Sequence, residues 1–179
     1  MPKTIENTIN NSSKNWHALY VSSRTEKKVM QTLLSKNIEA YVPLVKTMRQ
    51  WSDRKKMVEF PLINCYVFVN ISAFEIDRTL QTKGIVNFVR QSGKIAVIRE
   101  VEINRLKQLV DLGYQIESDA SISELEIGNK VKITSGPLKN IEGFIINKLN
   151  DKYLFVQLES IGKSIKVKLP EDLLLPIES

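Results

Sequence analysis

Hydrophobic residues recur at two different spacings along the first third of the chain, and the change of spacing predicts its secondary structure. Residues 16–22 (WHALYVS) are rich in β-branched and aromatic side chains, which favours a strand. Ser23 and Glu26 have the spacing of a capping box, and apolar residues follow at helical intervals as far as Asn37. The pattern therefore predicts a strand followed by a helix that begins at Ser23 and ends near Asn37.

The same reading extends to residue 112. A second capping-box pattern at Ser72–Glu75 predicts a short helix, and Gly84 and Gly113 are typical helix stops. Strands are predicted at 39–50 (interrupted by Pro43), 57–62, 65–71, 85–91 and 95–98, and helices at 72–82 and 100–112. This order predicts an α+β sandwich, in which helices pack against a mostly antiparallel sheet.

Beyond residue 125 the pattern contains only strands and turns. Residues 114–125 are acidic and lose the periodicity, which predicts a linker. Period-two segments follow at 130–134, 144–147, 153–158 and 165–169, separated by Gly136-Pro137, Asn150-Asp151 and Gly162. The turns would break a helix repeatedly, so strands are expected and not a helical hairpin. Several short strands in about fifty residues favour a small β-barrel, because closure removes exposed edges.

These patterns predict four parts: a disordered tail at 1–14, a first domain at 15–113, a linker at 114–125 and a barrel domain at 126–179. The tail lacks the apolar core of a secretion signal, and no apolar run approaches the roughly 20 residues of a membrane helix. A single cysteine, Cys65, excludes an internal disulfide framework. A soluble cytoplasmic protein without membrane contact is expected.

Charge separates the two predicted domains. The chain carries 26 Lys and Arg against 20 Asp and Glu. Residues 15–113 hold 16 of the basic and 9 of the acidic side chains, giving +7, whereas residues 114–179 hold 8 and 10, giving −2. A basic domain attracts polyanions, and its clustered Lys and Arg release counterions on meeting phosphate. Nucleic-acid contact by the first domain is one interpretation, and an ordinary solvated surface is the other.

Catalytic chemistry has little support in the sequence. His17 is the only histidine and lies in the opening strand, which favours a structural or surface role. Cys65 has no second cysteine for a zinc site and no neighbouring histidine for a thiolate pair. There is no phosphate-binding loop of the P-loop or dinucleotide type. We expect neither an enzyme nor a cofactor or metal.

Three stretches carry motifs: Trp16–Val21 (WHALYV), residues 61–69 (PLINCYVFV), and residues 128–138 (GNKVKITSGPL) with Ile141-Glu142-Gly143. The first resembles the W-Y-x-x-x strand of the NusG family of bacterial transcription elongation factors. The second lies where that family carries F-P-G-Y-[VL]-[FL]-V, and the third is similar to its KOW motif, G-x-x-V-x-[IV]-x-x-G-P-[FL] and a later Gly. The resemblance runs from Trp16 to Pro176 and implies a polymerase-binding domain followed by a KOW barrel.

A narrower resemblance concerns residues 49–56 (RQWSDRKK) and the S-R-x-E-K-K-V start of the first helix. Both are similar to specialised paralogues of the Upx Y type, which antiterminate transcription of capsular polysaccharide operons. The chain departs from the family at Ile63, Asn64 and Cys65, which replace the usual Phe, Pro and Gly. Loss of Pro-Gly changes the chemistry of that turn.

The resemblance implies two contacts with the large subunits of RNA polymerase. An apolar depression that binds the clamp helices would be lined by Tyr20, Ile63, Tyr66, Ile103 and Leu106; the alternative is that these residues are simply core. A gate-loop contact would come from Asp77, Arg78 and Thr79. Bridging the main cleft would hold the clamp closed and oppose pausing and termination.

The resemblance also implies contacts with nucleic acid and with a further protein. Non-template DNA or leader RNA would be contacted by Arg24, Lys27, Lys28, Thr82, Lys83 and, in the basic segment, Arg49, Arg54, Lys55 and Lys56. Loops of the barrel, with Leu138, Ile141 and Ile161, would bind the ribosomal protein NusE or the termination factor Rho. A monomer is expected. The alternatives are a general NusG-type elongation factor and a ribosome-associated RNA-binding KOW protein.

Overall fold

A computed structural model describes residues 13–50, 55–113, 115–118, 130–148, 151–169 and 177–178. The internal contacts divide the chain into two compact units, Met1–Val42 with Asn64–Ile103 and Pro43–Ile63 with Asn104–Ser179. The second unit thus includes residues 43–63 and 104–113, which the sequence pattern assigned to the first domain. The domain bounds expected from the sequence stay a prediction.

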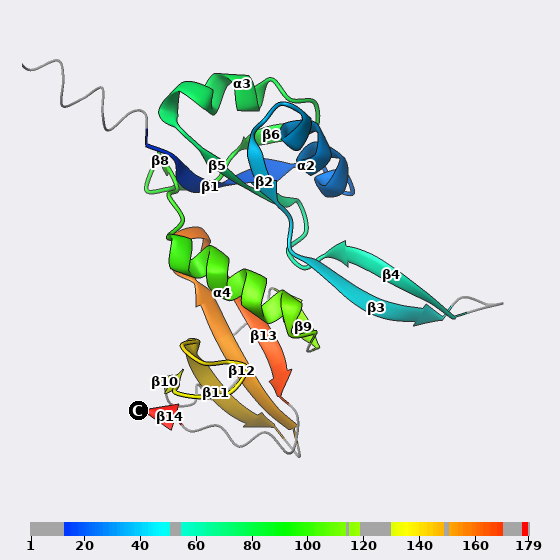
Figure 1. Cartoon of the computed structure of the whole chain (residues 1–179), viewed down its shortest axis with the longest axis vertical. Helices are drawn as coiled ribbons and strands as arrows, with labels where there is room; N and C mark the ends of the chain where they lie inside the picture. The colour runs from blue at the N-terminus through cyan, green and yellow to red at the C-terminus, as the bar shows by residue number, and fades with distance from the viewer. Residues whose placement is uncertain are drawn as a thin grey trace, which may run out of the picture. The chain divides into compact units, whose positions relative to one another are not determined.

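The first unit is built on a four-stranded antiparallel sheet with the strand order β2-β5-β1-β6 (Figure 1). Its strands are β1 (Asn15–Val21), β2 (Glu39–Tyr41), β5 (Tyr66–Ile71) and β6 (Ile85–Phe88). Leu19 lies opposite Val67 on one side and Phe88 on the other, and all three are buried. Directly paired residues share a face of the sheet, so this row forms part of the core.

Helices flank this sheet, as the sequence predicts. The helix α2 (Glu26–Ser35) buries Val29 and Leu33 and contacts β2 and β5. The short helices η1 (Ala73–Glu75) and α3 (Ile76–Leu80) follow β5, and α4 (Glu100–Asp111) follows the small pair β7 (Arg90–Gln91) and β8 (Lys94–Ile95). The predicted α+β class with an antiparallel sheet is confirmed.

The capping box predicted at Ser72–Glu75 is confirmed. The Glu75 carboxylate accepts hydrogen bonds from the Ser72 amide at 2.9 Å and from the Ser72 hydroxyl at 3.0 Å. The hydrogen bond from the Ser72 backbone holds the pKa of the Glu75 carboxyl below its ordinary value. The predicted helix at 72–82 therefore begins where expected, although its first turn is a 3₁₀ turn and α3 ends at Leu80.

His17 has a structural role in the first unit. Its ring is buried, its Nδ1 lies 2.9 Å from the Ala96 carbonyl oxygen, and it meets the Phe88 ring edge-on at 6.0 Å between centroids. These contacts connect β1 to the segment before α4. The histidine is thus held within the core, where a buried polar ring needs such a partner.

The second unit contains a two-stranded antiparallel ribbon, β3 (Leu44–Gln50) and β4 (Lys55–Pro61), whose strands pair only with each other among the described residues. The predicted strand at 39–50 is split, since β2 ends at Tyr41 and β3 begins after Pro43. Proline has no amide hydrogen for a strand ladder, which explains the break. The Leu62 amide donates to the Pro43 carbonyl oxygen at 2.7 Å and closes the base of the ribbon.

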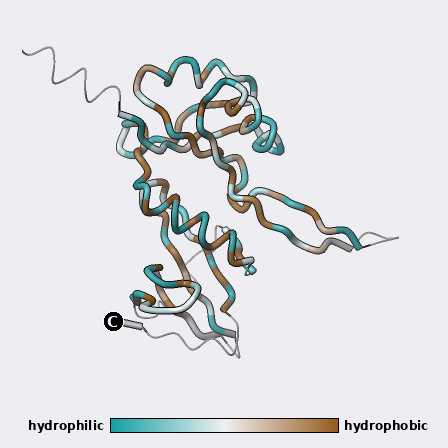
Figure 2. The backbone as a smooth tube through the Cα atoms, viewed as in Figure 1, coloured by the Kyte–Doolittle hydropathy of each residue, from teal (hydrophilic) through white to brown (hydrophobic). Residues whose placement is uncertain are grey.

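The remaining strands of the second unit form one antiparallel sheet with the order β14-β10-β11-β12-β13-β9. The strands are β9 (Ile116–Ser118), β10 (Lys130–Ile133), β11 (Glu142–Lys148), β12 (Asp151–Leu158), β13 (Lys163–Leu169) and β14 (Ile177–Glu178). Alternate residues such as Val131, Ile133, Ile165 and Val167 are buried, and hydrophobic positions recur along the strands (Figure 2). The predicted strands, as opposed to a helical hairpin, are confirmed. Closure of this sheet into a barrel stays a prediction.

The segment predicted as a linker contains a strand. Residues 116–118 form β9, which pairs with β13 and places the buried Ile116 opposite Val167. Three residues are too short a run to show alternation in the sequence, and β9 depends on the free edge that β13 offers. Of the predicted linker, residue 114 and residues 119–125 lie outside the described part of the chain.

Gly143 allows two strands of the β domain to approach closely. A Cβ atom at this position would overlap the Phe155 carbonyl oxygen and touch the Leu154 side chain. Gly143 pairs with Val131 in β10, and its neighbour Phe144 pairs with Phe155 in β12. The glycine expected from the KOW pattern therefore has a steric reason, because no larger residue fits without moving the β12 backbone.

We expect Gly143→Ala to destabilise the β domain by about 1–3 kcal/mol, the usual cost of forcing extra volume into a packed site. Thermal and urea unfolding of the full chain, followed by circular dichroism, measure the change. Lys132→Ala, at an exposed position of β10, is the matched control. A Gly143→Ala variant as stable as the control would contradict the close approach of β11 and β12.

Candidate functional site

Two tyrosines form an exposed aromatic pair on the sheet of the first unit. Tyr20 of β1 lies directly opposite Tyr66 of β5. Their rings meet edge-on, with centroids 5.8 Å apart and planes at 88°. Tyr20 is 46% exposed and Tyr66 is half-buried. The structure thus brings together two of the five predicted groove residues and leaves their rings open to a partner.

Tyr41 extends this aromatic face and was not identified from the sequence. In the pairing of β2 with β5, Tyr41 lies opposite Phe68, and the two ring centroids are 6.4 Å apart. Phe68 is two residues from Tyr66, so both point to the same side of β5. Tyr41 therefore shares the face of Tyr20 and Tyr66. Only the register between β2 and β5 reveals this, and no local pattern encodes that register.

The other three predicted groove residues are buried. Ile103 belongs to the first unit and Ile63 and Leu106 to the second, and each is at most 1% exposed. None of the three presents its side chain to solvent in this conformation. The common groove of all five residues therefore stays a prediction.

The turn before Tyr66 is held by a carboxylate. Cys65 has a φ of +64°, a left-handed conformation that favours glycine. Its amide donates to Glu26 Oε1 at 2.8 Å, and its carbonyl oxygen accepts from the Val21 amide at 2.9 Å. The Glu26 side chain is buried, so this charged acceptor is shielded from water. The turn thus positions the start of β5 and, with it, the Tyr66 ring.

This contact also overturns the capping box predicted at Ser23–Glu26. The N-cap of α2 is Thr25, which makes no side-chain capping bond, and the Glu26 carboxylate reaches Cys65 instead of the Ser23 amide. Arg24 has a φ of +64°, so the chain turns sharply between Ser23 and the helix. A long-range partner has replaced the local one that the spacing suggested.

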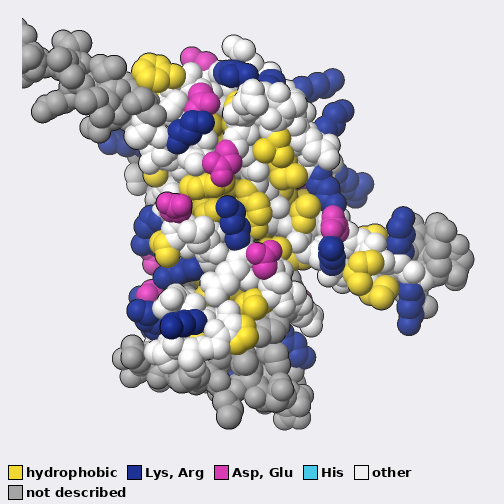
Figure 3. Space-filling view, in the orientation of Figure 1, with side chains coloured by type: hydrophobic (Ala, Val, Ile, Leu, Met, Phe, Trp, Pro, Cys, Tyr) yellow, Lys and Arg dark blue, Asp and Glu magenta, His cyan; other side chains and the backbone are white. Residues whose placement is uncertain are grey.

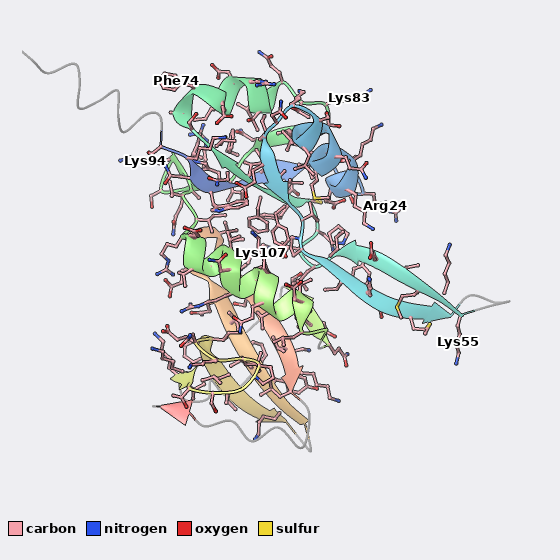
Figure 4. The ribbon with its side chains drawn as sticks, viewed as in Figure 1. Arg24, Lys55, Phe74, Lys83, Lys94 and Lys107 are labelled. Carbon is pink, nitrogen blue, oxygen red and sulfur yellow. The ribbon has the colours of Figure 1, made fainter. Side chains whose placement is uncertain are left out.

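Basic side chains from two separate segments gather beside α2. The Ser22 amide donates to the Gly84 carbonyl oxygen at 2.8 Å and so brings the turn with Arg24 next to the segment with Lys83. Arg24, Lys28 and Lys83 are exposed, and Lys27 is half-buried. Figure 4 labels Arg24 and Lys83, and both side chains extend outward from the first unit. Four of the predicted nucleic-acid residues thus lie in one basic region.

Thr82 does not belong to that surface. It is 2% exposed, and its Oγ1 accepts a hydrogen bond from Lys36 Nζ at 2.8 Å. The prediction of a nucleic-acid contact through Thr82 is therefore wrong for this conformation. The same bond brings the Lys36 ammonium close to the residue that precedes Lys83, and the sequence pattern did not identify this cation.

Only two of the three predicted gate-loop residues are exposed. Asp77 and Arg78 face solvent, and an Arg78 guanidinium nitrogen donates to the Lys36 carbonyl oxygen at 2.8 Å at the end of α2. Thr79 is fully buried, and its hydroxyl donates to the Glu75 carbonyl oxygen at 2.7 Å. Thr79 is therefore part of the core of the unit, and its predicted contact is wrong for this conformation.

In the ribbon of the second unit, Lys55 and Lys56 are exposed, and Lys55 lies at its distal end (Figure 4). Arg49 pairs with Lys56 through the backbone. Arg54 lies outside the described residues. The predicted basic segment is therefore a basic end of a β-ribbon, as far as the structure describes it.

The predicted partner residues of the β domain are mostly covered. Leu138 and Ile141 are fully buried, and Ile161 is half-buried. The loop that carries Leu138 is bound to α4, because Gln108 Nε2 donates to the carbonyl oxygens of Pro137 at 3.0 Å and Lys139 at 3.4 Å. The expectation that Leu138 and Ile141 are exposed is thus wrong for this conformation, and their contact with another protein stays a prediction.

Within the described residues, no group of three or more His, Cys, Asp or Glu side chains has the geometry to hold a metal ion. The helices of that part of the chain are all too short or too polar to cross a membrane. The chemistry that the site offers is therefore that of aromatic, basic and backbone contacts with a macromolecule.

Comparisons with known proteins agree with this architecture. A family model described as "Transcription termination factor nusG" matches residues 14–107, more than half of the chain. A structure of Thermotoga maritima NusG, titled "Domain interaction in Thermotoga maritima NusG", is similar with a TM-score of 0.50 and 20% identity, over 88% of this chain and 93% of that one. At that identity the structural likeness concerns the fold alone. No curated protein matches the chain.

We expect substitutions at Cys65 to separate by their tolerance of the left-handed turn. Cys65→Gly should stay within about 1 kcal/mol of the parent protein, because glycine adopts this φ freely but loses more entropy on folding. Cys65→Val should cost at least about 1–2 kcal/mol, because a β-branched residue is strained there. Unfolding in urea measures both.

Glu26→Ala tests the other half of the same turn. Removal of the carboxylate leaves the Cys65 amide without its acceptor and should cost about 1.5–3 kcal/mol. Glu39→Ala, at an exposed carboxylate of β2, is the control. Equal stability of the Glu26 and Glu39 variants would show that the buried carboxylate does not hold the turn.

Proposed function

Because this chain belongs to the NusG family of transcription factors, we propose that it binds RNA polymerase and acts as a transcription elongation and antitermination factor. The observation that carries the proposal is the exposed Tyr20–Tyr66 pair. A hydrophobic groove that accepts an amphipathic helix is a common mode of protein recognition, and tyrosine supplies rigid contact area with a polar end. The clamp helices of the large polymerase subunit would be the partner of this aromatic face.

A second contact would come from α3. Asp77 and Arg78 are exposed on this helix and would meet the gate loop of the other large subunit. Holding both sides of the main cleft would favour the closed clamp, and a factor that favours the closed state opposes pausing and termination by a shift in population. The proposed action therefore needs no catalytic group.

The basic region at Arg24, Lys28 and Lys83 would lie against the non-template DNA strand or the leader RNA. Its support is the gathering of basic side chains from two segments that the Ser22–Gly84 hydrogen bond brings together. Lys and Arg contacts to phosphate position a protein on nucleic acid, while sequence is read by added base contacts. The sequence features shared with Upx Y type paralogues extend the proposal to a surface-polysaccharide operon.

The β domain would provide a further contact, with NusE or with Rho. The half-buried Ile161 is the accessible apolar candidate, since Leu138 and Ile141 are covered in this conformation. Its position between β12 and β13 supports a role in such a contact.

Truncation of the tyrosines tests the polymerase contact. We expect Tyr66→Ala to weaken binding to core RNA polymerase by about 2 kcal/mol, roughly thirtyfold, because aromatic anchors at interfaces typically cost this much. Tyr20→Ala should act in the same direction. Titration of labelled full-length protein with polymerase measures the affinity, and melting curves measure the stability of each variant.

Phe74→Ala is the matched control, because Phe74 is 68% exposed on η1 and lies outside the Tyr20–Tyr66 pair. It should leave binding unchanged. If Tyr66→Ala binds normally while its melting temperature falls, the tyrosine belongs to the core and the proposed contact is wrong.

Charge removal tests the nucleic-acid contact. The triple variant Arg24→Gln, Lys28→Gln and Lys83→Gln should reduce read-through of a terminator while polymerase binding stays near that of the parent protein. The dependence of nucleic-acid affinity on salt should flatten by about one unit of slope for each phosphate that the variant no longer neutralises. Lys94→Gln, an exposed lysine at the start of β8, is the control. An unchanged slope in the triple variant would exclude these residues from the contact.

A further inference from the structure

The β3–β4 ribbon is long, thin and unsupported along its strands. Seven residue pairs join its strands without a bulge, from Leu44↔Pro61 to Gln50↔Lys55. At about 3.4 Å per residue, each strand is about 20 Å long. A two-stranded ribbon alone is at best marginally stable in water, so a protein that keeps one this long is expected to use it in a contact.

The charge of the ribbon is strongly asymmetric. Its fourteen strand residues include Lys46, Arg49, Lys55 and Lys56 but only one carboxylate, Glu59, which lies 3.6 Å from Lys46. The cations farther along the ribbon, at Lys55 and Lys56, are exposed and have no carboxylate opposite them in the strand register. The distal half of the ribbon therefore carries a surplus of positive charge, which is complementary to a polyanion.

Two methionines stand among these charges. Met48 and Met57 are directly paired across the ribbon and are 59% and 53% exposed. Figure 3 shows hydrophobic side chains on the ribbon with Lys and Arg side chains around them. Exposed apolar side chains in matched positions have no folding benefit and are typical of a binding surface. Methionine is well suited to this, since its flexible thioether adapts to an irregular surface.

Among polyanions, duplex DNA fits this combination better than RNA does. The major groove of B-form DNA is about 12 Å wide and admits a two-stranded ribbon, whereas the major groove of A-form RNA is too narrow for side chains to read. Binding of single strands relies on stacked aromatic rings. In the described strands of the ribbon the one aromatic residue is Phe60, one position from the base at Pro61 and half-buried.

We propose that the β3–β4 ribbon enters the major groove of B-form duplex DNA, with Lys55 and Lys56 against the phosphates and the Met48–Met57 pair against base edges. The thymine methyl group is the apolar feature of that groove and is the expected contact of the methionines. The inference rests on the proposed function for the presence of DNA beside the protein. It names a duplex contact separate from the basic region at Arg24 and Lys83.

The test uses the full-length protein without polymerase and a fluorescent DNA duplex of about two helical turns. At about 50 mM salt the parent protein should bind this duplex more tightly than single-stranded DNA or duplex RNA of the same length. The double variant Lys55→Gln, Lys56→Gln should lower the salt slope by about two units. The control double variant Lys132→Gln, Lys139→Gln removes two exposed lysines of the β domain and should leave the slope unchanged.

The methionine contact is tested by substituting deoxyuridine for thymine, which removes only the methyl groups. The parent protein should bind the deoxyuridine duplex at least about fourfold more weakly, the effect of one apolar carbon returned to water. Met48→Gln, Met57→Gln should weaken binding to the thymine duplex to a similar extent, keep the salt slope, and abolish the discrimination between the two duplexes. Circular dichroism and light scattering verify that each variant stays folded and monodisperse.

Equal affinity for duplex and single strand, or a salt slope that Lys55 and Lys56 do not affect, would overturn the inference. So would a methionine variant that binds both duplexes as the parent does but binds polymerase more weakly, because the pair would then contact a protein. The ribbon variants should retain polymerase binding and the Tyr66→Ala variant should retain duplex binding. Each proposal can therefore fail without the other.

Discussion

The hydrogen bond between the buried Glu26 carboxylate and the Cys65 amide holds the first unit in the form that the candidate site needs. It connects the start of α2 to the turn that opens β5, and the Val21 amide binds the same turn from β1. Three elements thus meet at one left-handed residue. Because a buried carboxylate is costly unless it is hydrogen-bonded, the contact fixes the turn more strongly than a solvated bond would. The orientation of Tyr66 follows from it.

The sequence predicted the elements well because their signals are local. Apolar spacing and turn residues identify α2, β5, α4 and the strands of the β domain, and Ser72–Glu75 predicts a capping box that forms. Ser23–Glu26 has the same local signal and fails, since the Glu26 carboxylate accepts its hydrogen bond from an amide 39 residues away. A spacing rule cannot weigh a partner that only the tertiary fold supplies.

The candidate site was less predictable because it depends on registers and on short helices. Tyr41 joins the aromatic face only through the pairing of β2 with β5. Thr79 and Thr82 lie in or just after a five-residue helix, where a shift of one position turns a side chain from solvent into the core. Leu138 is covered in a loop that receives hydrogen bonds from Gln108 in α4, and no pattern in the loop itself announces this distant partner.

The ribbon has a consequence for the protein when nothing is bound to it. The outer edges of β3 and β4 pair with no other described strand, so their amides and carbonyls are open to any extended chain that approaches. Such edges invite stacking into aggregates, and natural proteins protect them with charge, lysine above all. Lys46, Lys55 and Lys56 therefore act as gatekeepers as well as ligands for phosphate. The same side chains that would draw the ribbon to its partner also keep two copies of the protein apart, so solubility and recognition cannot be altered independently in this segment.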